Sequence, residues 1–281
     1  MMENKITPEQ IEGFSEHLRQ SERSSGTIEN YLRHVRAFAA WLGDRPVTRE
    51  TAAGWKEHLI DTGYCPNTNN AMLGGLNRFF VLNGRHDCQV RNLRLQRQLF
   101  RDGSRELTRA EYDRLIAAAH ALGRERLALL METICATGIR VSEVQYITME
   151  AVRQSRAEIT LKGKIRTILI PGKLRRKLLK YAQQNKTVSG EIFLTRNGKG
   201  LSRKQIWAEM KAICKAAGVA ASKVSPHNLR HLFARVFYRV CRDVAKLADV
   251  LGHSSIETTR IYLISTGSEH ARELERTGLV V

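Results

Sequence analysis

Residues 251–262 of the chain read LGHSSIETTRIY. The spacing of apolar residues predicts helices at 243–250 and 256–263, on either side of His253. Tyr262 follows His253 by nine positions. On its own, such a tyrosine is most often a half-buried core residue. The stretch becomes informative because three other motifs precede it in the chain.

The motif before it, residues 226–231, reads PHNLRH in a predicted helix. His227 and Arg230 are three positions apart, so both side chains lie on one face of that helix. His231 is one turn beyond His227, and two such histidines can share a metal ion. A zinc site needs further ligands, and the pair lacks the adjacent glutamate of the zinc-protease motif. The motif therefore favours a polar helix face over a metal site.

Further upstream, residues 136–144 read ATGIRVSEV. Arg140 follows Gly138, which is expected to end a helix, and apolar residues surround it. A buried arginine needs a partner, and the carboxylate of Glu143 is one turn away. Taken alone, this motif is typical of a structural ion pair.

Between these motifs, two strands are predicted at 158–161 and 167–170, joined by a turn from Lys162 to Arg166. The turn contains KGK, in which Gly163 lets the chain tighten and the lysines point outward. Taken alone, this is an exposed basic turn.

In this order and spacing, the four motifs resemble the tyrosine recombinases, the family that includes phage integrases and the Xer recombinases. The resemblance covers nearly the whole chain. It implies that Tyr262 is the nucleophile and that Glu143 supports the first catalytic arginine. The implied catalytic set is Arg140, Lys162, His227, Arg230, His253 and Tyr262, with Lys164 as the alternative to Lys162.

The implied fold class is mainly α with a small antiparallel β-sheet, in a helical core-binding domain and a tyrosine-recombinase catalytic domain. Apolar spacing in the first hundred residues predicts a four-helix unit. We place the core-binding domain at 1–92, a basic linker at 93–106, and the catalytic domain with its C-terminal tail at 107–281. The resemblance implies that the two domains clamp DNA from both sides. We also expect a compact form without a separate arm-binding domain.

The charge distribution points to the same substrate. The net charge is +18, and residues 105–281 hold 32 Lys and Arg against 16 Asp and Glu. Such a basic excess favours a polyanion surface. No apolar run approaches the roughly 20 residues of a membrane-spanning helix. The five scattered cysteines, without a CxxC pair, indicate reduced thiols in a cytoplasmic protein. We expect that protein to be nucleoid-associated.

The residue types suit phosphoryl transfer. Attack on a phosphodiester adds negative charge to its oxygens, which two permanently charged arginine forks can bind. We therefore expect neither a metal nor another cofactor. A phenol ionises only near pH 10, so it needs a base, for which His227 is the candidate. The 5′-oxygen leaves as a poor anion and needs a proton, which the ammonium of Lys162 would supply. A 3′-phosphotyrosine retains the bond energy, so rejoining would require no ATP.

The resemblance implies site-specific integration, excision or resolution on duplex DNA with inverted-repeat core sites. A homodimer would occupy one site and a homotetramer the synapse, with accessory DNA-bending or directionality proteins as further partners. The tail from Thr266 docks either on its own domain or on the neighbouring subunit. Two alternatives are a type IB topoisomerase-like enzyme and a DNA-binding protein without catalysis.

Overall fold

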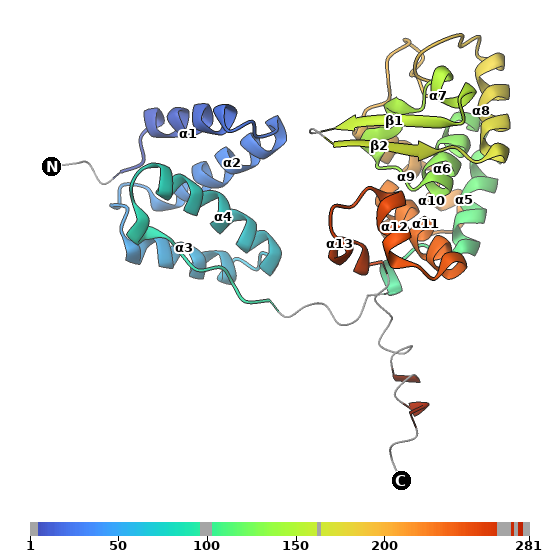
Figure 1. Cartoon of the computed structure of the whole chain (residues 1–281). Coiled ribbons are helices and arrows are strands. Elements are labelled where there is room, and N and C mark those ends of the chain that lie inside the picture. The colour runs from blue at the N-terminus through green and yellow to red at the C-terminus, as the bar shows by residue number, and fades with distance from the viewer. Residues whose placement is uncertain (1–4, 96–102, 162–163, 263–270, 273–274, 278–281) are drawn as a thin grey trace. The chain divides into compact units, whose positions relative to one another are not determined.

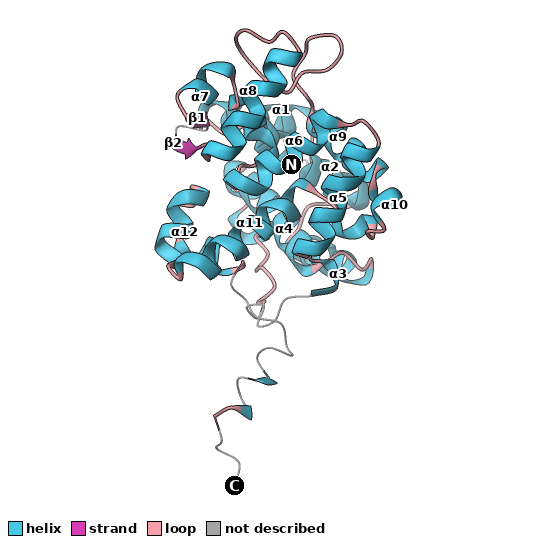
Figure 2. Cartoon of the chain, turned by 90° about the vertical axis from the view of Figure 1, so that its right-hand side faces the viewer, coloured by secondary structure: helices cyan, strands magenta, loops and turns pink. Residues whose placement is uncertain are grey.

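The computed structural model describes residues 5–95, 103–161, 164–262, 271–272 and 275–277. By internal contacts, the chain forms two compact units, residues 1–97 and 98–281, and the division falls within the predicted linker. Helices dominate both units, and β1 and β2 form a two-stranded antiparallel sheet (Figures 1 and 2). The predicted fold class is confirmed. None of the described helices combines the length and apolar character that a membrane crossing requires.

The first unit is built from four helices with well-defined starts. They are α1 (Pro8–Gln20), α2 (Ser25–Leu42), α3 (Arg49–Asp61) and α4 (Pro66–Leu82), followed by the 3₁₀ turn η1 (His86–Cys88). Thr7 and Thr48 cap α1 and α3 through reciprocal capping boxes. The helices enclose an aromatic core in which Phe38 packs edge-on against Phe80, with ring centroids 5.8 Å apart.

The chain stays attached to this unit for several residues beyond α4. The side-chain amide of Asn77 makes two hydrogen bonds with the backbone of Val90, at 2.8 and 2.9 Å. Asn70 holds Leu93 in the same way, at 3.0 and 2.7 Å. These amides replace the strand partners that an extended segment would otherwise lack.

The second unit begins with the turn η2 (Gly103–Arg105) and two packed helices. Its elements continue through the hairpin to a group of C-terminal helices around α11. In order they are α5 (Arg109–Ala121), α6 (Glu125–Thr137), η3 (Val141–Tyr146), α7 (Met149–Arg153), β1 (Arg156–Leu161), β2 (Lys164–Leu169), α8 (Gly172–Gln184), α9 (Arg203–Ala212), α10 (Cys214–Ala217), η4 (Ala221–Lys223), α11 (Pro226–Cys241), α12 (Val244–Leu251) and α13 (Ile256–Arg260). Helix α11 packs against α6 and α12 (Figure 1). Helices α9 and α10 separate at the fully buried Ile213.

The hairpin is longer than predicted, and its turn is shorter. Strand β2 begins at Lys164, so Arg166 lies within the strand opposite Ile159 and not in the turn. The predicted turn, Lys162 to Arg166, was therefore too long at its C-terminal end. Ile165 and Leu169 are both 75% exposed, whereas Arg166 shares the inward face of the strand with the buried Ile168.

Candidate active site

The end of α6 positions the first arginine. Gly138 ends the helix with a φ of +65°, and a side chain at this position would overlap the ring of Phe233 in α11. A glycine is therefore required here for two reasons, the positive φ of its backbone and the close packing of the Phe233 ring. The chain then turns into η3 and presents Arg140 at the start of that short helix.

Glu143 is almost completely buried and closes back on Arg140. Its Oε2 accepts a hydrogen bond from the Arg140 backbone N–H at 2.7 Å, and its Oε1 accepts one from Nη1 at 3.0 Å. The Arg140 side chain is 40% exposed. The buried carboxylate thus orients a guanidinium that remains accessible to a ligand.

A second arginine, Arg166 of β2, donates to the same carboxylate. Its Nη1 also donates to the carbonyl of Val250 near the end of α12, at 3.2 Å. Burial lowers the pKa of Arg166, and the charge of Glu143 opposes this shift. Sequence reasoning assigned Arg166 no role. The sequence feature that could have revealed this role is the spacing of two between Arg166 and Ile168. That spacing places both side chains on the inner face of the strand.

Arg230 is buried in α11, only 2% exposed, and its guanidinium contacts main-chain carbonyls. It donates to the carbonyl of Gly138 at the end of α6 and to that of Leu251 at the end of α12, the latter at 2.8 Å. Helix C-termini carry partial negative charge, so they stabilise a buried cation without a carboxylate. Burial lowers the pKa of Arg230, and a hydrogen bond with Tyr262 opposes the shift.

His253 lies beside this guanidinium as a hydrogen-bond acceptor. Its Nε2 is 3.0 Å from Arg230 Nη2, and its Nδ1 is 2.8 Å from Thr259 Oγ1. Arginine can only donate, so Nε2 accepts, and the ring proton is assigned to Nδ1, which donates to Thr259. Burial, with the charges of Arg230, Arg140 and Arg166, lowers the pKa of His253 to about 4.

Tyr262 is 4% exposed and packs in a small apolar cluster formed by α11 and α12. Its ring centroid lies 4.4 Å from that of His231 and 5.8 Å from that of His253. His227 connects to the same group, because its Nε2 is 2.7 Å from Nε2 of His231. Burial, and then the charge of Arg230, lowers the pKa of His227.

The histidine pair does not have the geometry of metal ligands. At 2.7 Å, the two Nε2 atoms of His227 and His231 are at hydrogen-bonding distance. Two nitrogens on a tetrahedral zinc, each about 2.0–2.1 Å from the metal, would lie farther apart. Among the described residues, no group of three His, Cys, Asp or Glu side chains is arranged to hold a metal. His231 instead contacts both His227 and Tyr262, a position that sequence reasoning did not assign to it.

Lys162 lies outside the described residues, together with Gly163. The structure therefore brings together Arg140, Glu143, Arg230, His253 and Tyr262, and links His227 to Tyr262 through His231. The hairpin strands on either side of Lys162 are described, and Arg166 ties β2 to the end of α12.

A cavity of about 390 Å³ is lined by three of the predicted site residues, Arg140, Glu143 and His253. Its lining contains three guanidinium groups, one carboxylate and one imidazole. The lining residues are Arg140, Ser142, Glu143, Ile159, Arg166, Arg203, Gly252, His253, Ser254 and Thr258. Arg203, at the start of α9, was not among the predicted site residues. The excess of cations suits an anionic ligand such as a phosphate.

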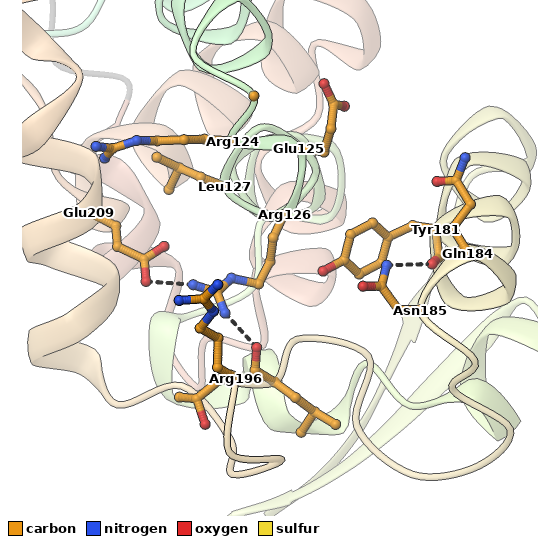
Figure 3. A pocket seen from close by; sticks show the side chains of 12 residues that line it. Arg124, Glu125, Arg126, Leu127, Tyr181, Gln184, Asn185, Arg196 and Glu209 are labelled. Atoms are coloured by element: carbon orange, nitrogen blue, oxygen red, sulfur yellow. Dashed lines mark hydrogen bonds and ion pairs between the residues drawn. The ribbon is translucent and has the colours of Figure 1, made fainter.

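A larger cavity, of about 820 Å³, lies among α6, α8 and α9 and contains none of the predicted site residues (Figure 3). Its most central cation, Arg126, donates to Glu209 at 2.7 Å and to the Leu194 carbonyl at 2.5 Å. This arginine is therefore already engaged in structural contacts, and the site is assigned to the smaller cavity.

Comparison with known proteins identifies the class. The family model described as the phage integrase family matches residues 105–269. Tyrosine recombinase XerA of Pyrococcus furiosus is 29% identical and aligns over 100% of this chain and 98% of its own. Tyrosine recombinase XerD of Brucella melitensis is 30% identical, over 90% of this chain and 91% of its own.

The fold is shared with solved structures. The chain matches a crystal structure of XerA recombinase with a TM-score of 0.52 at 22% identity, over 97% of this chain and 98% of that chain. It also matches a lambda integrase (75-356) dimer bound to a COC′ core site, with a TM-score of 0.73 at 19% identity. That match covers 91% of this chain and 94% of that chain. The family model and the sequence relatives confirm the predicted class, a tyrosine recombinase that breaks and rejoins DNA. The chain belongs to the phage integrase family.

Proposed function

We propose that this recombinase cleaves duplex DNA at a specific site by forming a 3′-phosphotyrosyl link through Tyr262. The observation that carries the proposal is the position of Arg230. Its guanidinium joins the ends of α6 and α12, donates to His253 and lies close enough to Tyr262 for the two side chains to interact. Three motifs from distant parts of the sequence therefore meet at one buried cation.

Arg140 and Arg230 would bind the non-bridging oxygens of the scissile phosphate. Their positive charge would offset the negative charge that develops as the phenol oxygen attacks phosphorus, while Glu143 keeps Arg140 in place. Because the arginines supply this charge, the step as proposed uses no metal or other cofactor. His227 would accept the phenolic proton, and its connection to Tyr262 through His231 supports that role.

His253 would change its hydrogen-bonding role when DNA binds. It is a neutral acceptor toward Arg230, with a pKa lowered by burial and by three arginines. A bound phosphate would offset these positive charges and favour protonation of Nε2. The imidazolium would then donate a hydrogen bond to a phosphate oxygen.

Tyr262 would have to move before it can react. Nucleophilic attack requires the phenol oxygen to approach phosphorus to about 3–3.5 Å. At 4% exposure and packed against α11 and α12, the side chain has little access to a duplex. We therefore infer that binding of the DNA site is coupled to repositioning of the segment that carries Tyr262.

Lys162 would protonate the leaving 5′-oxygen, since an ammonium remains charged near neutral pH and can donate. Lys164 is the alternative donor. The reverse reaction would use the same groups, so rejoining needs no nucleotide.

Assembly on DNA is proposed by analogy with the solved relatives. Two lambda integrase structures contain a dimer bound to a core site and a tetramer bound to a Holliday junction. We propose a dimer on one inverted-repeat site and a tetramer in synapsis, with the tail docking on the neighbouring subunit. Accessory DNA-bending or directionality proteins would be further partners. The reaction would take place at the nucleoid in the cytoplasm.

The proposal is tested by trapping on a nicked suicide duplex. The cognate site is first located by sequencing DNA ends that carry covalently attached protein. Wild-type protein should give a denaturation-resistant adduct, and Tyr262→Phe should bind the duplex equally well without forming one. An adduct with the phenylalanine variant would exclude Tyr262 as the nucleophile.

A further inference from the structure

Glu143 accepts more hydrogen bonds than its support of Arg140 requires. Its two oxygens accept from the Arg140 backbone, from the Arg140 guanidinium and from the Arg166 guanidinium. The Glu143 side chain is 2% exposed and that of Arg166 is 14% exposed, so little solvent screens this pair. The carboxylate is thus held from two sides by elements far apart in sequence, η3 and β2.

Arg166 also reaches a third element. Its Nη1 donates to the Val250 carbonyl, two residues before the turn that leads to His253. Gly252 lies against the same guanidinium, and a Cβ at that position would overlap the Arg166 side chain. One side chain therefore connects the hairpin, the support of Arg140 and the segment that carries His253.

We propose that Arg166 is a positioning residue for the cleavage step: it holds Glu143 against Arg140 and fixes the hairpin relative to the His253 segment. This inference rests on the proposed function of Arg140 and His253. A lysine cannot replace the arginine fully, because a single ammonium lacks the planar fork that engages Glu143 and Val250 at once.

Direct binding of phosphate is the rival role for this side chain. Arg166 lines the cavity, and its Nε has no hydrogen-bond partner among the described residues. The two roles differ in their dependence on Glu143. A positioning effect passes through the carboxylate, whereas a phosphate contact would persist without it.

The experiment is a double-mutant cycle read as single-turnover cleavage of the suicide duplex at saturating protein. Arg166→Gln should slow cleavage about 30-fold with DNA affinity within threefold of wild type. In the Glu143→Gln background, the same change should cost no more than about threefold. Arg156→Gln, at the exposed start of β1 in the same hairpin, removes an equal charge and should cleave at the wild-type rate.

A second substrate separates positioning from a purely structural role. A methylphosphonate at the scissile position removes the charge of one non-bridging oxygen, so the reaction depends less on Arg140. The defect of Arg166→Gln should then shrink to below about fivefold. An unchanged defect on this substrate, or an undiminished defect in the Glu143→Gln background, would overturn the proposal.

Arg166→Lys provides a variant if the glutamine protein folds poorly. It keeps the charge and one donor, so its cleavage rate should lie between those of wild type and Arg166→Gln. A lysine variant with the full wild-type rate on ordinary DNA would contradict the need for the fork. The wild-type protein in the same gel tests the Tyr262 chemistry independently. Absence of a wild-type adduct would contradict the proposed function, whereas a normal wild-type adduct with no defect in Arg166→Gln would contradict only the role of Arg166.

Discussion

Replacing Thr259 by valine tests the hydrogen bond that orients His253. Thr259 is fully buried, and its Oγ1 lies 2.8 Å from Nδ1 of His253. Because Arg230 donates to Nε2, the proton of the neutral ring sits on Nδ1 and needs the threonine oxygen as its acceptor. Valine has nearly the same shape as threonine and offers no acceptor. The variant therefore leaves a partly buried N–H donor without a partner.

The expected loss follows from that unsatisfied donor. A buried donor without an acceptor costs about 1–3 kcal/mol. In a unit of this size, each kcal/mol lowers the melting temperature by roughly 2–4 °C, so a loss near the middle of the free-energy range, about 2 kcal/mol, gives a decrease of about 4–8 °C. Once Nδ1–H has no fixed partner, the other ring tautomer competes. We expect cleavage to slow about tenfold, which corresponds to about 1.4 kcal/mol.

Ring ¹⁵N chemical shifts give the His253 tautomer directly, and single-turnover cleavage gives the rate. Thr259→Ser retains the hydroxyl and should keep the tautomer and at least a third of the wild-type rate. If the valine variant retained both the Nδ1–H tautomer and a rate within twofold of wild type, the assignment of His253 as an oriented acceptor would be refuted.

Three further predictions address other parts of the site. Lys162→Ala should block cleavage of ordinary DNA, and a 5′-bridging phosphorothiolate, whose thiolate leaves without a proton, should rescue it; rescue confined to Lys164→Ala would reassign the acid. The folded protein keeps His253 neutral down to about pH 4, whereas an unfolded histidine protonates near 6.5, so stability should fall as pH drops from 6.5 toward 4. His253→Gln should make the urea midpoint depend less on pH across that window, and an unaltered pH profile would contradict the pKa shift. Gly138→Ala should cost about 2–4 kcal/mol through its positive φ and the Phe233 ring, and a urea-derived loss under 0.5 kcal/mol would contradict this packing.

Local patterns in the sequence were sufficient for most helices and for the chemical class. The apolar spacing and capping residues of the first unit are local signals, and Thr7 and Ser24 cap its first two helices. The active-site motifs are also local, because each is a short run of neighbouring residues. Glu143 follows Arg140 by three positions, and the structure forms the ion pair that this spacing allows.

The remaining features depend on contacts between distant segments. The buried partners of Arg230 are main-chain carbonyls at two helix ends, and a carbonyl has no sequence signature. Arg166 was misplaced because two apolar residues of β2 face outward and the arginine faces inward. Arg203 reaches the cavity from α9, and nothing in its neighbourhood distinguishes it from a solvated surface charge.

The central claim is that Tyr262 becomes covalently attached to DNA, and peptide mapping of the trapped adduct tests it most directly. Trypsin cuts after Arg260 and Arg272, which yields the peptide IYLISTGSEHAR, residues 261–272, with a single tyrosine. After nuclease trimming, fragmentation mass spectrometry should place a 3′-phosphoryl nucleotide on Tyr262. A nucleotide on any of the other six tyrosines, or on a serine or threonine, would contradict the proposed mechanism.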